Sequence, residues 1–139
     1  MTNNLEKDEV NQWCFACGRL NPIGLKLQFA EENDTYITRF TAGPEHQSYD
    51  GIVHGGIIST LLDEITTRYV YIKGVTAVTA RLEVRYRQPT PIGVELKVTG
   101  KITGQRGKMY ELTGTIELPD GTVTAQAKTT AIVIDGGQT

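Results

Sequence analysis

The stretch EHQSYDGIVHGGIISTLLDE, residues 45–64, marks the point where a polar loop passes into an amphipathic helix. His54, Gly55 and Gly56 open an apolar repeat that continues to Lys73, so we expect a helix from about Gly55 to Lys73. On a helical wheel at about 100° per residue, the apolar side chains fall within roughly 140°. They are Ile57, Ile58, Leu61, Leu62, Ile65, Tyr69 and Ile72. This stripe predicts a helix that packs on a sheet.

The other side of this predicted helix is unusual for a surface facing water. It carries Ser59, Asp63, Thr66 and Val70, with Thr67 nearby. A solvated helix face usually has more lysine and glutamate. Small polar residues around one carboxylate suit a face that lines a cleft or is covered by another subunit.

Residues on both sides of the helix show the period-2 alternation of strands. Upstream, GLKLQF (residues 24–29) and DTYITRFT (residues 34–41) predict a hairpin with EEN (residues 31–33) as its turn. Downstream lie four β-branched runs separated by turn signals, which predict a four-stranded antiparallel meander. They are VTAVTARLEVRYRQ (75–88), VELKVTGKIT (94–103), KMYELTGTIEL (108–118) and TVTAQAKTTAIVI (122–134). The order predicts an α+β domain in which a curved antiparallel sheet wraps one central helix.

Length and charge limit the function classes. The 139 residues suit one domain at 13–134, between a mobile segment at 1–12 and a flexible tail at 135–139. With 14 basic and 16 acidic residues, the chain has no basic excess to recruit nucleic acid or an anionic membrane. It has no apolar run typical of a signal peptide or membrane span, so we expect a cytoplasmic protein. Unpaired sheet edges favour a homo-oligomer.

Cys14 and Cys17 form a single C-x-x-C motif. Tetrahedral zinc needs four ligands, and the two histidines, His46 and His54, lie far away without metal-binding spacing. We therefore favour structural thiols and no metal. A metal shared between subunits and a redox pair are the alternatives.

The helix start provides two elements of hydrolytic catalysis. Backbone N–H groups in a first helical turn lack internal partners and lie at the positive end of the helix dipole. Gly55 and Gly56 would let a carbonyl oxygen approach such donors closely. Asp63 follows as a candidate base, whereas Glu64 precedes Arg68 by four residues and has a helix ion pair available.

The order H-G-G-x-x-x-x-L-x-D, from His54 to Asp63, resembles the signature of PaaI-type hotdog thioesterases, and CFACGRLNPIGL (residues 14–25) is similar to a stretch in one branch of them. The resemblance implies a hotdog fold and cofactor-free hydrolysis of an acyl-CoA thioester at a dimer interface. It implies that the Gly55 N–H polarises the thioester carbonyl, and that Asp63 of the facing subunit activates water or attacks directly. Thr79 matches the position where the family keeps a serine or threonine near this carboxylate, which implies that its side chain holds the attacking water.

Other assignments are less direct. Before the acid, the family tends to have an amide side chain that contacts the substrate carbonyl. In this chain the matching position is Ser48, so we favour the neighbouring Gln47 as the second contact to the carbonyl. His54 either caps the helix or touches the ligand. The coenzyme A phosphates need cations: Arg81, Arg85 and Arg87 share one strand face, while Arg106 and Lys108 lie in the GQRGK turn. We assign substrate contacts to Gly56, Arg87, Arg106 and Lys108.

Two other functions remain open from the sequence. A hotdog dehydratase would use a histidine with a helix carboxylate, and both residue types are present. A non-catalytic acyl-CoA binding module would gain little from a buried carboxylate beside an anionic ligand. Neither the acyl group nor the choice between dimer and tetramer follows from the sequence.

Overall fold

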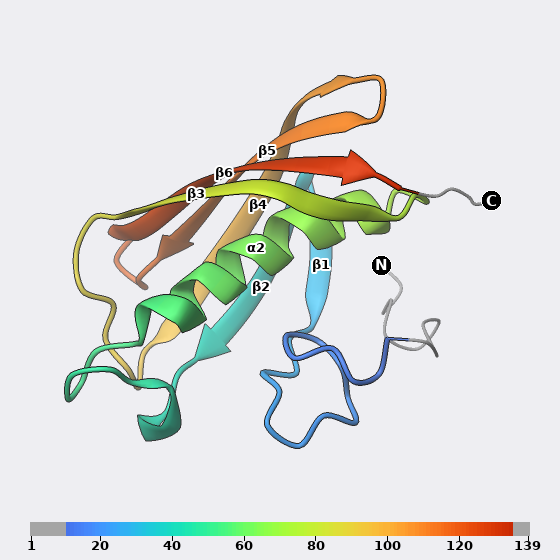
Figure 1. The fold of residues 1–139 in the computed structure, drawn as a ribbon. Helices are drawn as coiled ribbons and strands as arrows, with labels where there is room; N and C mark the ends of the chain where they lie inside the picture. Colours follow the sequence, from blue (N-terminus) through green and yellow to red (C-terminus); the bar gives the residue numbers. More distant parts are fainter. Residues whose placement is uncertain (1–10, 135–139) are drawn as a thin grey trace.

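The computed structural model describes residues 11–134, so the predicted tail at 135–139 and most of the predicted N-terminal segment lie outside the described residues. One long helix and six strands form this part of the chain (Figure 1). The elements are β1 (Phe29–Glu32), β2 (Thr35–Thr41), the 3-10 helix η1 (Pro44–His46), α2 (Gly55–Tyr71), β3 (Ala77–Tyr86), β4 (Glu95–Arg106), β5 (Met109–Glu117) and β6 (Val123–Val133). No helix in residues 11–134 is long and apolar enough to cross a membrane.

All six strands form one antiparallel sheet in the order β1-β2-β4-β5-β6-β3. The sheet curves around α2, which lies along its concave face (Figure 1). This arrangement confirms the predicted α+β hotdog architecture, and the helix begins at Gly55 as expected.

Two glycines in the sheet bring its backbone close to the helix. A Cβ at Gly100 on β4 would lie 2.5 Å from the Ile65 carbonyl oxygen. A Cβ at Gly114 on β5 would lie 3.2 Å from the Leu62 side chain. Leu62 and Ile65 are fully buried, so the core lies between the concave sheet face and α2.

The predicted meander is wrong at its first strand. β3 pairs with β6 at the edge of the sheet, and β4 inserts between β2 and β5. The connection at residues 87–94 carries the chain from the β3 edge of the sheet to the position next to β2, and its backbone binds other loops on the way. The Val53 N–H donates to the Thr90 carbonyl, and the Gly93 N–H donates to the Ala42 carbonyl, both at 2.8 Å. Pro89 and Pro91 in this connection are incompatible with a tight hairpin turn.

The predicted opening hairpin is shifted. Residues 24–28 are not in a strand, since the N–H groups of Leu25 and Leu27 donate instead to Phe15 and Ala16 in the preceding loop. The sheet begins at Phe29, and the turn falls on Asn33 and Asp34, whose φ angles are 50° and 63°. Asparagine and aspartate tolerate this left-handed region better than other side chains.

The helix buries more of its surface than the apolar stripe predicts. Thr66 and Val70 were assigned to the opposite face, yet both are fully buried. The Thr66 hydroxyl donates to the Leu62 carbonyl at 2.8 Å and lies 2.9 Å from the hydroxyl of Thr129 on β6. A curved sheet covers a wider arc of a helix than a flat one, and these hydrogen bonds satisfy the buried hydroxyl.

Candidate active site

Asp63 lies on α2 where the helix faces the edge strand β3. The Thr79 hydroxyl on β3 donates a 2.5 Å hydrogen bond to Asp63 Oδ1. The Thr67 hydroxyl lies 2.7 Å from the Thr79 hydroxyl and 3.5 Å from the same carboxylate oxygen. Thr79 is therefore beside Asp63, where the family resemblance placed it, and Thr67 joins them.

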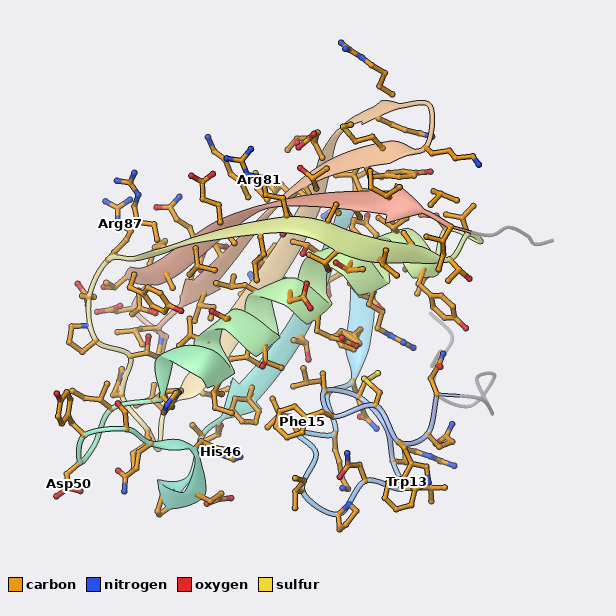
Figure 2. All side chains as sticks on the ribbon, in the orientation of Figure 1. Trp13, Phe15, His46, Asp50, Arg81 and Arg87 are labelled. Carbon is orange, nitrogen blue, oxygen red and sulfur yellow. The ribbon has the colours of Figure 1, made fainter. Side chains whose placement is uncertain are left out.

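A β-bulge aims Thr79 at the helix. The register between β3 and β6 shifts between Thr79 and Arg81. The extra residue lets both Thr79 and Leu82 face α2, although strict alternation would place them on opposite sides. Arg81 and Arg87 point away from the helix on the outer side of the sheet (Figure 2).

The start of α2 leaves one donor available. His54 Nδ1 accepts a 2.8 Å hydrogen bond from the Gly56 N–H, so this side chain caps the helix. Within residues 11–134, the Gly55 N–H has no hydrogen-bond partner. The positive end of the helix dipole favours an oxyanion at this N–H. The cap therefore occupies Gly56 and leaves Gly55 free to contact a ligand.

Tyr86, which belongs to no motif in the sequence, lies at this helix start. Its hydroxyl donates to the Gly55 carbonyl at 3.0 Å and lies 2.7 Å from the Ser59 hydroxyl. The signal that could have pointed to it is the alternation along β3, which puts Tyr86 on the opposite face from Arg85 and Arg87. Tyr86 thereby holds the carbonyl of Gly55, in the peptide that links Gly55 to Gly56.

The loop before the helix positions Gln47. Its Oε1 accepts the Gly51 N–H at 2.8 Å, and its backbone forms a bridge with Val53. His46 Nδ1 accepts the Gly43 N–H at 3.0 Å, and Figure 2 shows His46 and Asp50 in this loop. These bonds hold Gln47 at the end of the molecule where α2 begins.

Asp63 also lines an open hollow of about 440 Å³ between α2 and the N-terminal loop, where Trp13 and Phe15 are marked in Figure 2. The other residues that line this hollow are Asn11, Trp13, Cys14, Cys17, Glu64, Thr67, Arg68, Tyr71, Thr76 and Ala77. The catalytic candidate and the C-x-x-C motif thus share one hollow.

The predicted ion pair between Glu64 and Arg68 is absent from the described residues. Each side chain instead approaches a sulfur: Glu64 Oε2 lies 3.9 Å from Cys14 Sγ, and Arg68 Nη1 lies 3.6 Å from Cys17 Sγ. Burial raises the pKa of Glu64 to about 7. A hydrogen bond from the Cys17 thiol lowers the pKa of Cys14 to about 5 and raises that of Cys17.

Gly55 and Asp63 are separated along their helix. Asp63 follows Gly55 by eight positions on α2, a rise of about 12 Å. One thioester group cannot touch both within a single chain.

The predicted phosphate-binding cations also lie apart. Arg87 follows the end of β3 at the helix start, where its Nη1 donates to Gln126 Oε1 at 2.6 Å. Arg106 and Lys108 lie at the β4–β5 hairpin, next to the end of β6, which pairs with the first residues of β3. The length of β3, about 30 Å, separates the two groups within one chain.

Comparison with known families supplies the identification. A family model described as thioesterase superfamily matches residues 50–125, just over half of the chain and the segment containing Gly55, Asp63 and Thr79. This chain belongs to the thioesterase superfamily. The resemblance first seen in the HGG motif is confirmed at the level of the family and its hotdog fold.

Related proteins agree with this assignment. The chain is similar to the acyl-coenzyme A thioesterase THEM4 of Xenopus laevis, with 34% identity over 77% of this chain and 43% of that protein. It thus spans less than half of that relative. The E. coli PaaI protein from the phenylacetic acid degradation operon has a similar fold: TM-score 0.75, 17% identity, and coverage of 81% of this chain and 82% of PaaI. A Streptococcus mutans protein bound to acetyl CoA matches with TM-score 0.72 and 23% identity over 77% of this chain and 87% of that one.

Proposed function

We propose that this chain is an acyl-CoA thioesterase, which hydrolyses an acyl-CoA thioester to a free acid and coenzyme A. The observation that carries the proposal is the Asp63 carboxylate held by Thr79 at 2.5 Å within a thioesterase-superfamily fold. The name of the Xenopus relative and the acetyl CoA bound to the Streptococcus mutans protein support this substrate class.

In this mechanism the Gly55 N–H binds the thioester oxygen and stabilises the negative charge that develops on it. Asp63 accepts a proton from water, and the resulting hydroxide attacks the carbonyl carbon. The C–S bond then breaks and coenzyme A leaves as the thiolate. Thr79 orients the carboxylate, and Gln47 provides the second contact to the carbonyl. Oxyanion donors and general bases each contribute about a hundredfold or more in rate.

The catalytic site requires a homodimer. Because about 12 Å separates Gly55 from Asp63 along α2, we assign each active site to Gly55 of one subunit and the acid of its partner. Within residues 11–134, β1 and β3 are the two edge strands, and β3 is the one beside Asp63, so we assign its free edge to the two-fold axis.

Antiparallel pairing of β3 with its symmetry copy would also bring the separated cations together. The end of β3 in one subunit, which carries Arg87, would lie next to the start of β3 in the partner. The partner's β4–β5 hairpin, which carries the other two cations, lies at that same end of the sheet. We therefore assign the coenzyme A phosphates to Arg87 of one subunit and to the hairpin residues Arg106 and Lys108 from the other. The cytoplasmic location stays a prediction from the sequence.

The test is thiol release from a panel of short-chain, long-chain and aromatic acyl-CoAs. Asp63→Asn should lower kcat at least about a hundredfold with the fold intact. Asp34→Asn is the matched control, because Asp34 is an exposed turn residue whose left-handed φ of 63° suits asparagine equally well. Binding of the panel without turnover would instead identify a non-catalytic binding module, and hydration of an enoyl thioester would identify a dehydratase.

A further inference from the structure

The N-terminal loop and α2 bring three metal-ligating side chains together. Cys14 and Cys17 come from the loop and Glu64 from the helix, and one ligand atom of each lies within 4.8 Å of the other two. In residues 11–134 this is the one group of three or more such side chains at this spacing. The cluster lies beside Asp63 but includes neither that carboxylate nor its threonine partners.

The backbone of the loop presents both sulfurs on the same side. The Gly18 N–H donates to the Cys14 carbonyl at 2.9 Å, which closes the turn between the cysteines. The Cys17 N–H donates to Cys14 Sγ at 3.5 Å. A Cβ at Gly18 would lie 2.3 Å from the Gln12 carbonyl oxygen, so the turn requires glycine there. The turn therefore holds two thiols ready to chelate before any ion binds.

The spacing of the third ligand fits zinc. Zinc–sulfur bonds of about 2.3 Å and zinc–oxygen bonds of about 2.0 Å place tetrahedral sulfur and oxygen ligands about 3.5 Å apart. Cys14 Sγ and Glu64 Oε2 are 3.9 Å apart. A shift of a few tenths of an ångström would bring this pair to the zinc spacing, and the other ligand atoms lie within 4.8 Å, a range that side-chain motion can close.

A divalent cation would balance the charges of the cluster in its fully deprotonated form. Two thiolates and one carboxylate then carry three negative charges, and Arg68, whose Nη1 lies 3.6 Å from Cys17 Sγ, offsets one of them. The Arg68 guanidinium is fixed between the rings of Phe29 and Tyr71, at 5.4 Å and 5.5 Å. Adding a divalent ion brings the sum to zero, and the Arg68 contact with Cys17 Sγ becomes a supporting hydrogen bond to a metal-bound sulfur.

We propose that Cys14, Cys17 and Glu64 bind one zinc ion, with a fourth coordination position open to water in the hollow. Paired thiolates select zinc over magnesium or calcium, which prefer oxygen ligands. The ion fastens the N-terminal loop to α2 and thereby fixes one wall of the hollow that Asp63 lines. This role is structural and does not depend on thioester hydrolysis.

The test measures metal content and binding in the full chain, without an affinity tag and under reducing conditions. We expect about one zinc per chain by elemental analysis. Added zinc should raise the Tm of the metal-free protein, and cobalt(II) should give thiolate-to-metal charge-transfer absorption. Cys14→Ser and Cys17→Ser should each weaken zinc binding at least about a hundredfold, and Glu64→Gln at least about tenfold. Asp63→Asn, the adjacent matched carboxylate, should bind zinc like wild type.

Several results would overturn the proposal. One is a reduced, folded protein that copurifies with no zinc and shows neither a Tm shift nor cobalt absorption. Another is wild-type zinc affinity in the serine variants. A Cys14–Cys17 disulfide in protein isolated without reductant, combined with no metal binding after reduction, would identify a redox pair instead. Because Glu64→Gln preserves side-chain shape, it tests the site even if a serine variant fails to fold.

Discussion

The Thr79 hydroxyl lies 2.5 Å from Asp63 Oδ1, so a residue of the edge strand holds the acid of the central helix. We expect Thr79→Ala to lower kcat about tenfold to a hundredfold with little change in KM, because the carboxylate loses the donor that orients it. Thr79→Ser should retain most of the activity, since it keeps the hydroxyl. Steady-state thiol release measures both variants. Equal loss in alanine and serine variants would show that the hydroxyl is not what matters.

The free N–H of Gly55 can be removed with little change to the helix. Proline is well tolerated at the first helical position, and the φ and ψ of His54, −59° and 137°, suit a residue before proline. Gly55→Pro should therefore lower kcat about a hundredfold by deleting the oxyanion donor. Gly55→Ala is the control: it keeps the N–H, and its Cβ would meet the Tyr86 ring at an ordinary 3.6 Å. Circular dichroism checks the helix content of both. Full activity of the proline variant would remove Gly55 from the mechanism.

A site shared between subunits can be tested by mixing two inactive variants. Gly55→Pro and Asp63→Asn each damage every site of their own dimer. After subunit exchange, a mixed dimer has one intact site and one doubly damaged site, so equal amounts should recover about a quarter of wild-type activity. Thiol release before and after exchange gives the result. If exchange is verified and no activity returns, both groups act within one chain or one of them plays no part.

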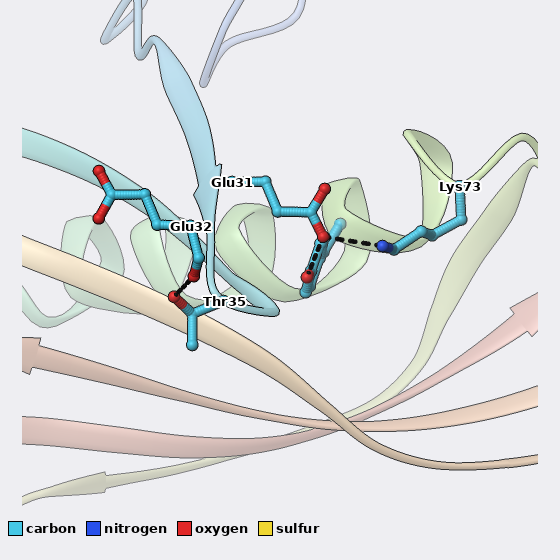
Figure 3. A network of polar contacts seen from close by, with 5 residues as sticks. Glu31, Glu32, Thr35 and Lys73 are labelled. Carbon is cyan, nitrogen blue, oxygen red and sulfur yellow. Dashed lines mark hydrogen bonds and ion pairs between the residues drawn. The ribbon is translucent and has the colours of Figure 1, made fainter. Parts of the chain in front are cut away.

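Glu31 should make the stability of the fold depend on pH. Its carboxylate on β1 accepts hydrogen bonds from the Tyr69 hydroxyl at 2.5 Å and from Lys73 Nζ at 2.8 Å (Figure 3). The Lys73 and Tyr69 hydrogen bonds lower the pKa of Glu31 below its ordinary value of 4.5. The ionised form is therefore favoured in the folded state. Its contribution is present above pH 4.5 and is lost as the pH falls through the lowered folded-state pKa.

Glu31→Gln should therefore reduce the free energy of unfolding at neutral pH by about 0.5–1 kcal/mol, the usual size for a partly exposed ion pair. The difference from wild type should shrink as the pH falls below 4.5, where the wild-type carboxylate also becomes protonated. Urea denaturation across this pH range measures it. Glu32→Gln is the matched control, because Glu32 is exposed and the Thr35 hydroxyl donates to its backbone carbonyl rather than to its side chain (Figure 3). A difference that does not change with pH would refute the explanation.

The sequence alone determined the elements that depend on local pattern. The apolar spacing after His54 predicted α2, and alternation predicted the strands after it, because side-chain periodicity is a property of a single segment. The HGG motif and its spacing to Asp63 identified the family and the candidate acid. These conclusions required no knowledge of which segments meet.

Only the tertiary structure decided which segments meet. Sequence order suggested that β3 would pair with β4, whereas the loop contacts of residues 87–94 carry the chain to the other side of the sheet. Alternation in residues 24–28 suggested a strand; Leu25 and Leu27 are buried, but their hydrogen bonds go to the cysteine loop instead of the sheet. Hydrogen-bond partners distant in sequence leave no trace in the periodicity of one strand.

The same reason explains the differences at the site. Helix spacing in the sequence paired Glu64 with Arg68 and gave no sign that either side chain would meet the C-x-x-C motif. The fold instead brings Glu64 to the two sulfurs from fifty residues away and places Arg68 beside Cys17. Spacing in sequence determined which side chains share a face of the helix. The packing of the N-terminal loop against that face determined which of them act together.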